Sequence, residues 1–173
     1  MSEGAIEVGA PPLRLTGAQR DAIVDHCRAA VFEQWGEQFL IEACGLLAGP
    51  MVGGEPTGEI TQVYPCRNAE ESARLYTVDS RDLLRAMRDA EERGDEIVGV
   101  WHSHTHTEAF PSQTDVRQAA DPAWFYVIVS LRDDEPVLRA FRIRDEQIAE
   151  VEVSVAGWGP PTGGGVGEES TTV

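Results

Sequence analysis

The sequence predicts a single α/β domain in which a mixed β-sheet is flanked by helices. Helical patterns alternate with apolar, strand-like runs in the first part of the chain, and a series of strand-like runs closes it. The length of 173 residues suits one domain with its own hydrophobic core. Apolar residues make up 42% of the chain and charged residues 25%, which is the composition of a globular protein.

Composition at the two ends sets the expected limits of this domain. Residues 1–12 are small and polar and end in two prolines, so we expect a flexible N-terminal arm. Residues 157–173 are rich in Gly, Pro, Ser and Thr, which predicts a disordered tail. The folded domain is therefore expected to cover residues 13–156.

The first predicted helix begins at a capping box. Thr16 and Gln19 have the required spacing, because the hydroxyl can accept a backbone N–H and the Gln side chain can reach back. Apolar residues then recur at helical spacing as far as Trp35, and Gly36 is expected to end the helix.

Strand-like runs follow, separated by turn residues and by two further helices. The predicted strands cover residues 44–49, 59–65, 75–79, 96–101, 124–131, 136–143 and 147–155. Asp79 or Ser80 should cap the second helix. Its predicted apolar positions are Leu83, Leu84, Met87 and Ala90. Residues 112–120 predict a third, short helix.

Charge and cysteine usage exclude several classes of protein. Lys and Arg number 14 against 30 Asp and Glu, a net charge of −16, so neither nucleic acid nor an anionic membrane is an expected partner. The three cysteines form no CxxC pair, which argues against a disulfide framework and a cysteine zinc site. With no signal-peptide pattern and no apolar run of about 20 residues, we expect a cytoplasmic location.

Three of the four histidines lie in one five-residue stretch, His102-Ser-His-Thr-His106. Side chains alternate along a strand, so His102 and His104 should point to the same face and could share one metal ion. Asp115 follows His104 by eleven residues, after a turn at Pro111, and can return a carboxylate to the imidazoles. Two nitrogens and one oxygen suit Zn²⁺, and hydrolytic zinc sites keep a fourth position open. A carboxylate is also needed to move protons, and Glu42 is the candidate because it precedes the apolar strand beginning at Cys44.

These residues together resemble a known signature. Glu42-x-Cys44-Gly45-Leu46-Leu47, followed by His102-Ser103-His104-x7-Ser112-x2-Asp115, is similar to the motif of the JAMM (MPN-plus) metalloproteases. Asn68-Ala-Glu, Tyr76 before Asp79, and Tyr126-Val-Ile-Val-Ser130 resemble the bacterial Mec-type branch. The resemblance covers most of the domain and implies a JAMM/MPN-like fold of cytidine-deaminase-like architecture.

The resemblance also implies a role for each matched residue. His102, His104 and Asp115 match the ligands of one zinc ion. Glu42 matches the acid/base residue that takes a proton from the attacking water and passes it to the leaving amine. Ser112 matches the residue that stabilises the tetrahedral oxyanion.

The resemblance further implies the substrate. It would be the Gly-Gly tail of a small ubiquitin-like sulfur-carrier protein, hydrolysed after its last glycine. In Mec-type relatives the adduct is a single cysteine, so hydrolysis would release cysteine in a cysteine-biosynthesis route.

Several alternatives remain open from the sequence. Ser112 and Asp115 also have capping-box form, so Ser112 can serve as a helix cap alone. Glu42 can be a solvated charge, and His106 lies outside the signature and suits a surface loop. A nucleobase deaminase is excluded because no PCxxC follows His106-Thr-Glu108. A non-catalytic MPN scaffold and an isopeptidase for carrier–protein conjugates remain as rival functions.

Overall fold

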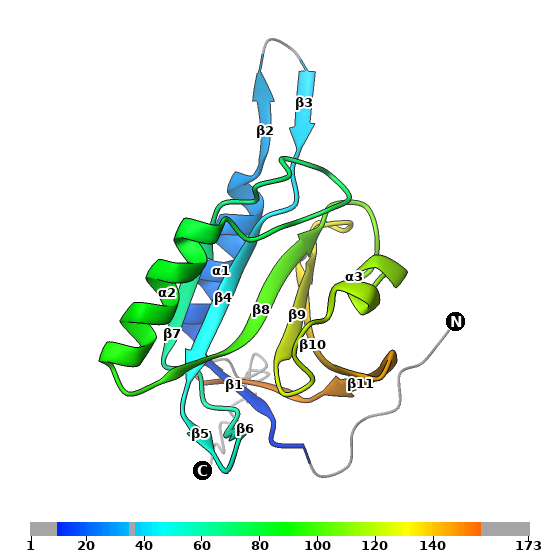
Figure 1. The fold of residues 1–173 in the computed structure, drawn as a ribbon. Helices are drawn as coiled ribbons and strands as arrows, with labels where there is room; N and C mark the ends of the chain where they lie inside the picture. The colour runs from blue at the N-terminus through cyan, green and yellow to red at the C-terminus, as the bar shows by residue number, and fades with distance from the viewer. Residues whose placement is uncertain (1–9, 35–36, 157–173) are drawn as a thin grey trace, which may run out of the picture.

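A six-stranded mixed sheet forms the centre of the fold in the computed structural model, which describes residues 10–34 and 37–156 (Figure 1). Its strands lie in the order β11-β10-β9-β8-β4-β7. They are β4 (Cys44–Gly49), β7 (Gln62–Cys66), β8 (Glu96–His104), β9 (Phe125–Ser130), β10 (Val137–Arg144) and β11 (Gln147–Val151). Strands β8 and β9 are parallel and the other neighbours are antiparallel. The predicted fold class, a mixed sheet flanked by helices, is confirmed.

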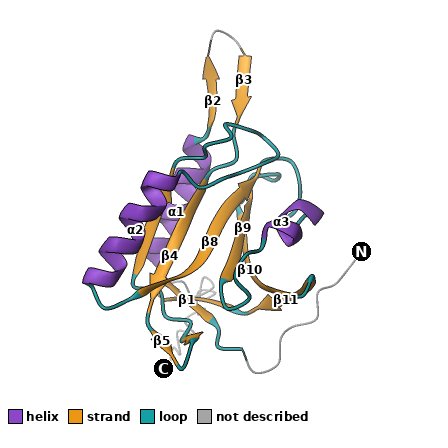
Figure 2. Cartoon of the chain, viewed as in Figure 1, coloured by secondary structure: helices purple, strands orange, loops and turns teal. Residues whose placement is uncertain are grey.

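Helices cover both faces of this sheet (Figure 2). Helix α1 (Gly17–Ala29) packs on one face, in a core that includes Trp101 and Phe125. Helix α2 (Ser80–Glu92) and the short helix α3 (Gln113–Gln118) lie over the other face, beside a second core. The sheet is thus buried on both sides, which explains why β4, β8 and β9 are almost uniformly apolar until β8 reaches its histidines.

Three two-stranded pairs complete the fold. Strand β1 (Leu13–Thr16) pairs in parallel with β12 (Val153–Ala156) and joins the two ends of the described domain. The hairpins are β2 (Val31–Gln34) with β3 (Glu37–Leu40), and β5 (Met51–Val52) with β6 (Glu55–Pro56). No helix in the described ranges is both long and apolar enough to cross a lipid bilayer.

The close packing of β4 against β8 requires a glycine. A Cβ at Gly45 would overlap the indole ring of Trp101 and the carbonyl oxygen of Tyr64. Gly45 therefore lets the buried indole lie directly over the strand. The close contact keeps β4 paired with β8, and Glu42 lies two residues before β4 begins.

The structure corrects the sequence predictions for the first helix and for residues 75–79. The first helix ends at Ala29 because Val31 and Phe32 pair with β3, where Phe32 stacks on Phe39. The expected end at Trp35 and Gly36 falls outside the described residues. Residues 75–79 form no strand beyond one isolated bridge at Val78.

On α2, the residues that pack inward are Asp82, Ala86 and Ala90. Leu84 and Met87 are exposed, so the face predicted from apolar spacing was partly wrong. Asp79 is the cap of this helix, as one of the two predicted candidates. The predicted arm at 1–12 lies outside the described residues except for its last three, and the tail at 157–173 lies outside them entirely, so these limits stay predictions.

Candidate metal centre

The carboxyl end of β8 presents two imidazoles on one face of the sheet. Strand alternation places Trp101 and Ser103 toward the α1 side and His102 and His104 toward the α2 and α3 side. Both imidazoles are buried, and their Nε2 atoms lie 3.1 Å apart. The predicted convergence of the two side chains is confirmed.

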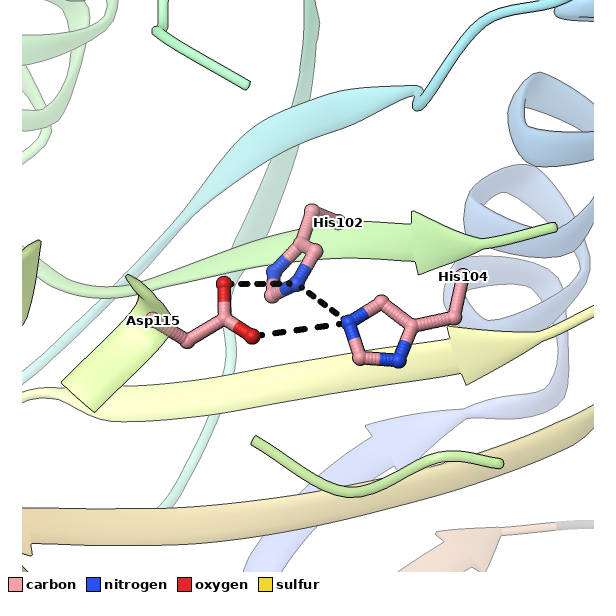
Figure 3. Close-up of side chains that lie close together, drawn as sticks. All are labelled: His102, His104 and Asp115. Carbon is pink, nitrogen blue, oxygen red and sulfur yellow. Dashed lines mark hydrogen bonds and ion pairs between the residues drawn. The ribbon is translucent and has the colours of Figure 1, made fainter. Parts of the chain in front are cut away.

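Asp115 completes the cluster from α3. Its Oδ1 lies 3.2 Å from Nε2 of His102 and its Oδ2 lies 3.5 Å from Nε2 of His104 (Figure 3). Ser112 is the N-cap of α3 and forms a reciprocal capping box with Asp115. The same turn that starts the helix therefore aims the carboxylate at the imidazoles.

The donor set fits a zinc ion. Nδ1 of His104 donates a hydrogen bond to the carbonyl oxygen of Glu108 at 2.9 Å, which leaves the lone pair of Nε2 facing the cluster. The three ligand atoms lie within 4.8 Å of one another. Tetrahedral zinc with ligands at about 2.0–2.1 Å needs ligand atoms roughly 3.3 Å apart, close to the separations seen here. A bound cation would compensate the repulsion between the lone pairs that these buried atoms direct at one another.

The electrostatics of the cluster favour the metal-binding forms of His102 and Asp115. Burial lowers the pKa of His102, so this imidazole tends to be neutral. Burial works to raise the pKa of Asp115, but contacts with His102 and His104 outweigh it and hold that pKa well below its usual range. Neutral imidazole and ionised carboxylate are the forms that bind a metal. For His104, burial favours the neutral form, but Asp115 outweighs it and raises the pKa.

Glu42 lies beside the cluster because β4 and β8 are in register. Cys44 pairs with His102, and Ala43 exchanges hydrogen bonds with Ser103 (Ser103 N–H to Ala43 O, 3.0 Å; Ala43 N–H to Ser103 Oγ, 2.8 Å). Glu42 directly precedes Ala43 and lines the same pocket as His104. Ser103 therefore helps to set the position of Glu42, a role that the sequence pattern alone did not reveal.

The segment between β7 and α2 also fixes Glu42. The Glu42 N–H donates to the carbonyl oxygen of Ser72 (2.8 Å), and the Asn68 side-chain amide donates to the carbonyl oxygen of Glu42 (2.9 Å). Tyr76, from the same segment, stacks on His102 with ring centroids 4.2 Å apart. Tyr76, which the sequence offered only as part of the family resemblance, thus packs against a candidate ligand.

All five predicted site residues lie around one position. A pocket of about 330 Å³ is open above His104 and Asp115. Its lining residues are Glu42, Ala73, Arg74, His104, Thr105, His106, Thr107, Ser112 and Asp115. His102 lies beneath this pocket, in contact with the other two candidate ligands. His106 is exposed at the pocket and belongs to no ligand set among the described residues.

The Glu42 carboxyl has the protonation behaviour of a general base. Only 7% of the residue is exposed, and burial raises its pKa from 4.5 to about 7, with His104 opposing the rise and Asp115 adding to it. A pKa near neutrality suits a group that accepts a proton and then returns it.

The raised pKa predicts a pH-dependent stability of the metal-free protein. Between pH 5 and pH 8 the unfolded chain loses the Glu42 proton before the folded chain does, so the carboxyl lowers the free energy of unfolding as pH rises. The free energy of unfolding of Glu42→Gln, measured relative to that of the unsubstituted protein, should therefore rise by about 2 kcal/mol from pH 5 to pH 8. Urea unfolding of both proteins in a chelator, at pH 5 and pH 8, measures this. An equal stability difference at both pH values would contradict the raised pKa.

Comparison with known proteins places this geometry in context. The family described as prokaryotic homologs of the JAB domain matches residues 18–144. A curated protein of Mycobacterium tuberculosis named CysO-cysteine peptidase is 44% identical over 115 residues, which cover 66% of this chain and 76% of that protein. A Haloferax volcanii protein named desampylase is 31% identical over 119 residues, covering 68% of this chain and 80% of that protein.

A solved structure shares both the fold and a substantial part of the sequence. The solution structure of protein DSY2949 from Desulfitobacterium hafniense superposes with a TM-score of 0.69 at 34% identity. The match covers 82% of this chain and 91% of that protein. The matched family range contains Glu42, His102, His104, Ser112 and Asp115.

Proposed function

The chain belongs to the prokaryotic JAB-domain family and is a hydrolase of the JAMM type; from this premise we propose that it is a zinc metallopeptidase acting on a small ubiquitin-like sulfur-carrier protein. It would hydrolyse the bond after the carrier's C-terminal Gly-Gly. We propose that the group released is cysteine, from a carrier–cysteine adduct, in a cytoplasmic route of cysteine biosynthesis.

One observation carries the proposal of peptidase chemistry. The pocket that exposes the His104 and Asp115 end of the ligand cluster is also lined by Glu42 and Ser112. The candidate ligands, a carboxyl with a near-neutral pKa and a hydroxyl thus line one pocket, which supports the proposal. A purely structural metal site does not need a buried carboxyl, such as that of Glu42, beside its ligands.

In the proposed mechanism, His102, His104 and Asp115 would hold the zinc ion. When bound, zinc would polarise the scissile carbonyl and make a nearby water more acidic. Glu42 accepts a proton from the attacking water and then donates it to the leaving nitrogen, so the same carboxyl serves as base and acid. The carbon–nitrogen bond breaks, the water oxygen joins the carbonyl carbon, and the products are a carrier carboxylate and a free amine.

Ser112 has two candidate roles, as the cap of α3 and as an oxyanion donor. Its hydroxyl accepts the Asp115 N–H (3.1 Å) and donates to Asp115 Oδ2 (2.6 Å), so its one proton is engaged. To stabilise an oxyanion, the hydroxyl has to turn that proton from Asp115 toward the substrate. Ser112 lines the pocket, so its hydroxyl would turn this proton toward a substrate bound there.

Ser112→Ala separates the two roles. We expect kcat to fall about 10²-fold, the loss typical of a removed oxyanion donor, while zinc content is largely kept. Loss of the cap should also reduce the free energy of unfolding by about 1 kcal/mol. Steady-state kinetics with metal analysis and urea unfolding measures each effect. An unchanged kcat with reduced stability would assign Ser112 to the helix cap alone.

The relatives support two different leaving groups. The name CysO-cysteine peptidase supports a single cysteine on the carrier, and the name desampylase, at lower identity, supports a carrier–protein conjugate. We place the cysteine adduct first because the more similar relative carries that name.

The deciding experiment compares two substrates with the zinc-loaded protein. One is a ubiquitin-like carrier whose Gly-Gly end is joined to cysteine, and the other is the same carrier joined to the side chain of a lysine in a protein. We expect the larger kcat/KM for the cysteine adduct. A larger value for the lysine conjugate would support the isopeptidase, and turnover of neither would leave a non-catalytic MPN scaffold.

A further inference from the structure

Arg74 is the one side chain with a permanent positive charge on the wall of the pocket that contains Glu42, His104 and Asp115. The residue is exposed, and no carboxylate in the described ranges forms an ion pair with it. In this chain with a net charge of −16, eight of the fourteen arginines form an ion pair with a carboxylate. An arginine with no ion-pair partner, in the lining of the pocket that also contains Glu42, is therefore a candidate binding group for an anion.

The position of Arg74 is tied to that of Glu42. Ser72 accepts the Glu42 N–H through its carbonyl oxygen (2.8 Å) and the Arg74 N–H through its hydroxyl (3.1 Å). Asn68 bridges the same segment by donating to the carbonyl oxygens of Glu42 and Leu75, each at 2.9 Å. The backbones of Glu42 and Arg74 are thus held by one hydrogen-bonded unit.

The chemistry of the leaving group says what such a cation would bind. Glu42 returns its proton to the leaving nitrogen, so that nitrogen must come close to Glu42. In an adduct of a single α-amino acid, a free carboxylate lies two bonds from this nitrogen. In an isopeptide the nitrogen is followed by four methylene groups and offers no charge nearby.

We propose that Arg74 binds the α-carboxylate of a single amino acid on the leaving side of the scissile bond. This inference rests on the proposed function and refines it: the enzyme acts as a carboxypeptidase for one residue beyond Gly-Gly. Neither Glu42 nor Asp115 can attract an anionic leaving group, whereas the guanidinium of Arg74 can. With Arg74, the carboxylate becomes the feature that distinguishes an amino-acid adduct from a protein conjugate.

The test uses two substrates that differ only in charge. A ubiquitin-like carrier ending in Gly-Gly is extended by one cysteine, either as the free acid or as the carboxamide, and kcat/KM is measured with the zinc-loaded full chain. We expect the acid to be preferred about tenfold, the size of one charge-assisted hydrogen bond in a partly solvated site. Arg74→Gln should bring this ratio close to one, and Arg74→Lys should restore part of it. Arg88→Gln, an exposed arginine on α2, should keep the full preference.

Each other outcome has a defined meaning. An unsubstituted enzyme that cleaves both substrates equally would overturn the role of Arg74 and leave the peptidase function intact. A preference that survives in Arg74→Gln would also overturn it.

A second pocket of about 420 Å³ adjoins the first through Thr105 and His106 and contains Arg28 and Arg132. Loss of the preference in Arg132→Gln alone would place the carboxylate there instead. Cleavage of neither substrate would overturn the proposed function itself.

Discussion

Glu42→Gln is expected to lower kcat by about 10²–10⁴-fold while the protein keeps its zinc, because general acid–base catalysis contributes on this scale. The amide occupies the same volume but cannot accept the proton of the attacking water. Glu42 is not a member of the candidate ligand set His102, His104 and Asp115, so metal affinity should change little. Turnover of the carrier–cysteine adduct and zinc content of the same preparation measure both consequences.

The matched control for this variant is Glu91→Gln, which makes the same chemical change at an exposed position of α2. It should keep the kcat of the unsubstituted enzyme. Retained activity in Glu42→Gln would remove Glu42 from the mechanism and make its buried position a matter of folding. Loss of zinc along with activity would show that Glu42 acts on the metal site instead of on the proton.

His102→Ala is expected to abolish zinc binding, from about one ion per chain to almost none, because a zinc site with only two protein ligands is rarely stable. His102 contacts both His104 and Asp115, so its removal leaves the cluster without a central member. Activity should be lost together with the metal. Metal analysis of the purified protein, after reconstitution with zinc and removal of the excess, measures the change.

The control for the metal site is His106→Ala. His106 lies two residues beyond His104 but outside the ligand set, so this variant should keep its zinc. Loss of zinc in His106→Ala would show that the ligand assignment is wrong. An unsubstituted protein that binds no zinc after reconstitution would overturn the peptidase function and favour the scaffold.

The sequence predicted the centre of the fold well because the signals there are strong. The runs at 44–49 and 96–101 are apolar on both faces and correspond to β4 and β8. The alternation of His102 and His104 followed directly from the strand that precedes them. Ser112 and Asp115 formed a local pattern that both a helix cap and a ligand position require, and the structure contains that cap.

The parts that failed depend on contacts distant in sequence. Residues 75–79 have strand-like composition, yet their hydrogen bonds go to the Asn68 region and Tyr76 packs on His102, so no strand forms. The first helix ends early because the hairpin pairing of Val31 with Leu40 competes with helical continuation. The role of Ser103 was also hidden, because its hydroxyl bonds to Ala43, sixty residues away.

The parallel pairing of β1 with β12 has a consequence for synthesis on the ribosome. Leu13 is completely buried and lies beside Val153. Strand β1 therefore cannot pair until β12, the last strand of the described domain, has been synthesised. Closing so long a loop is slow, and α1 would emerge with its apolar face uncovered. The metal ligands and Glu42 are all translated before this closure, so zinc could reach an incomplete domain. Pairing of β1 with β12, more than synthesis of the site, would then set when the domain is complete.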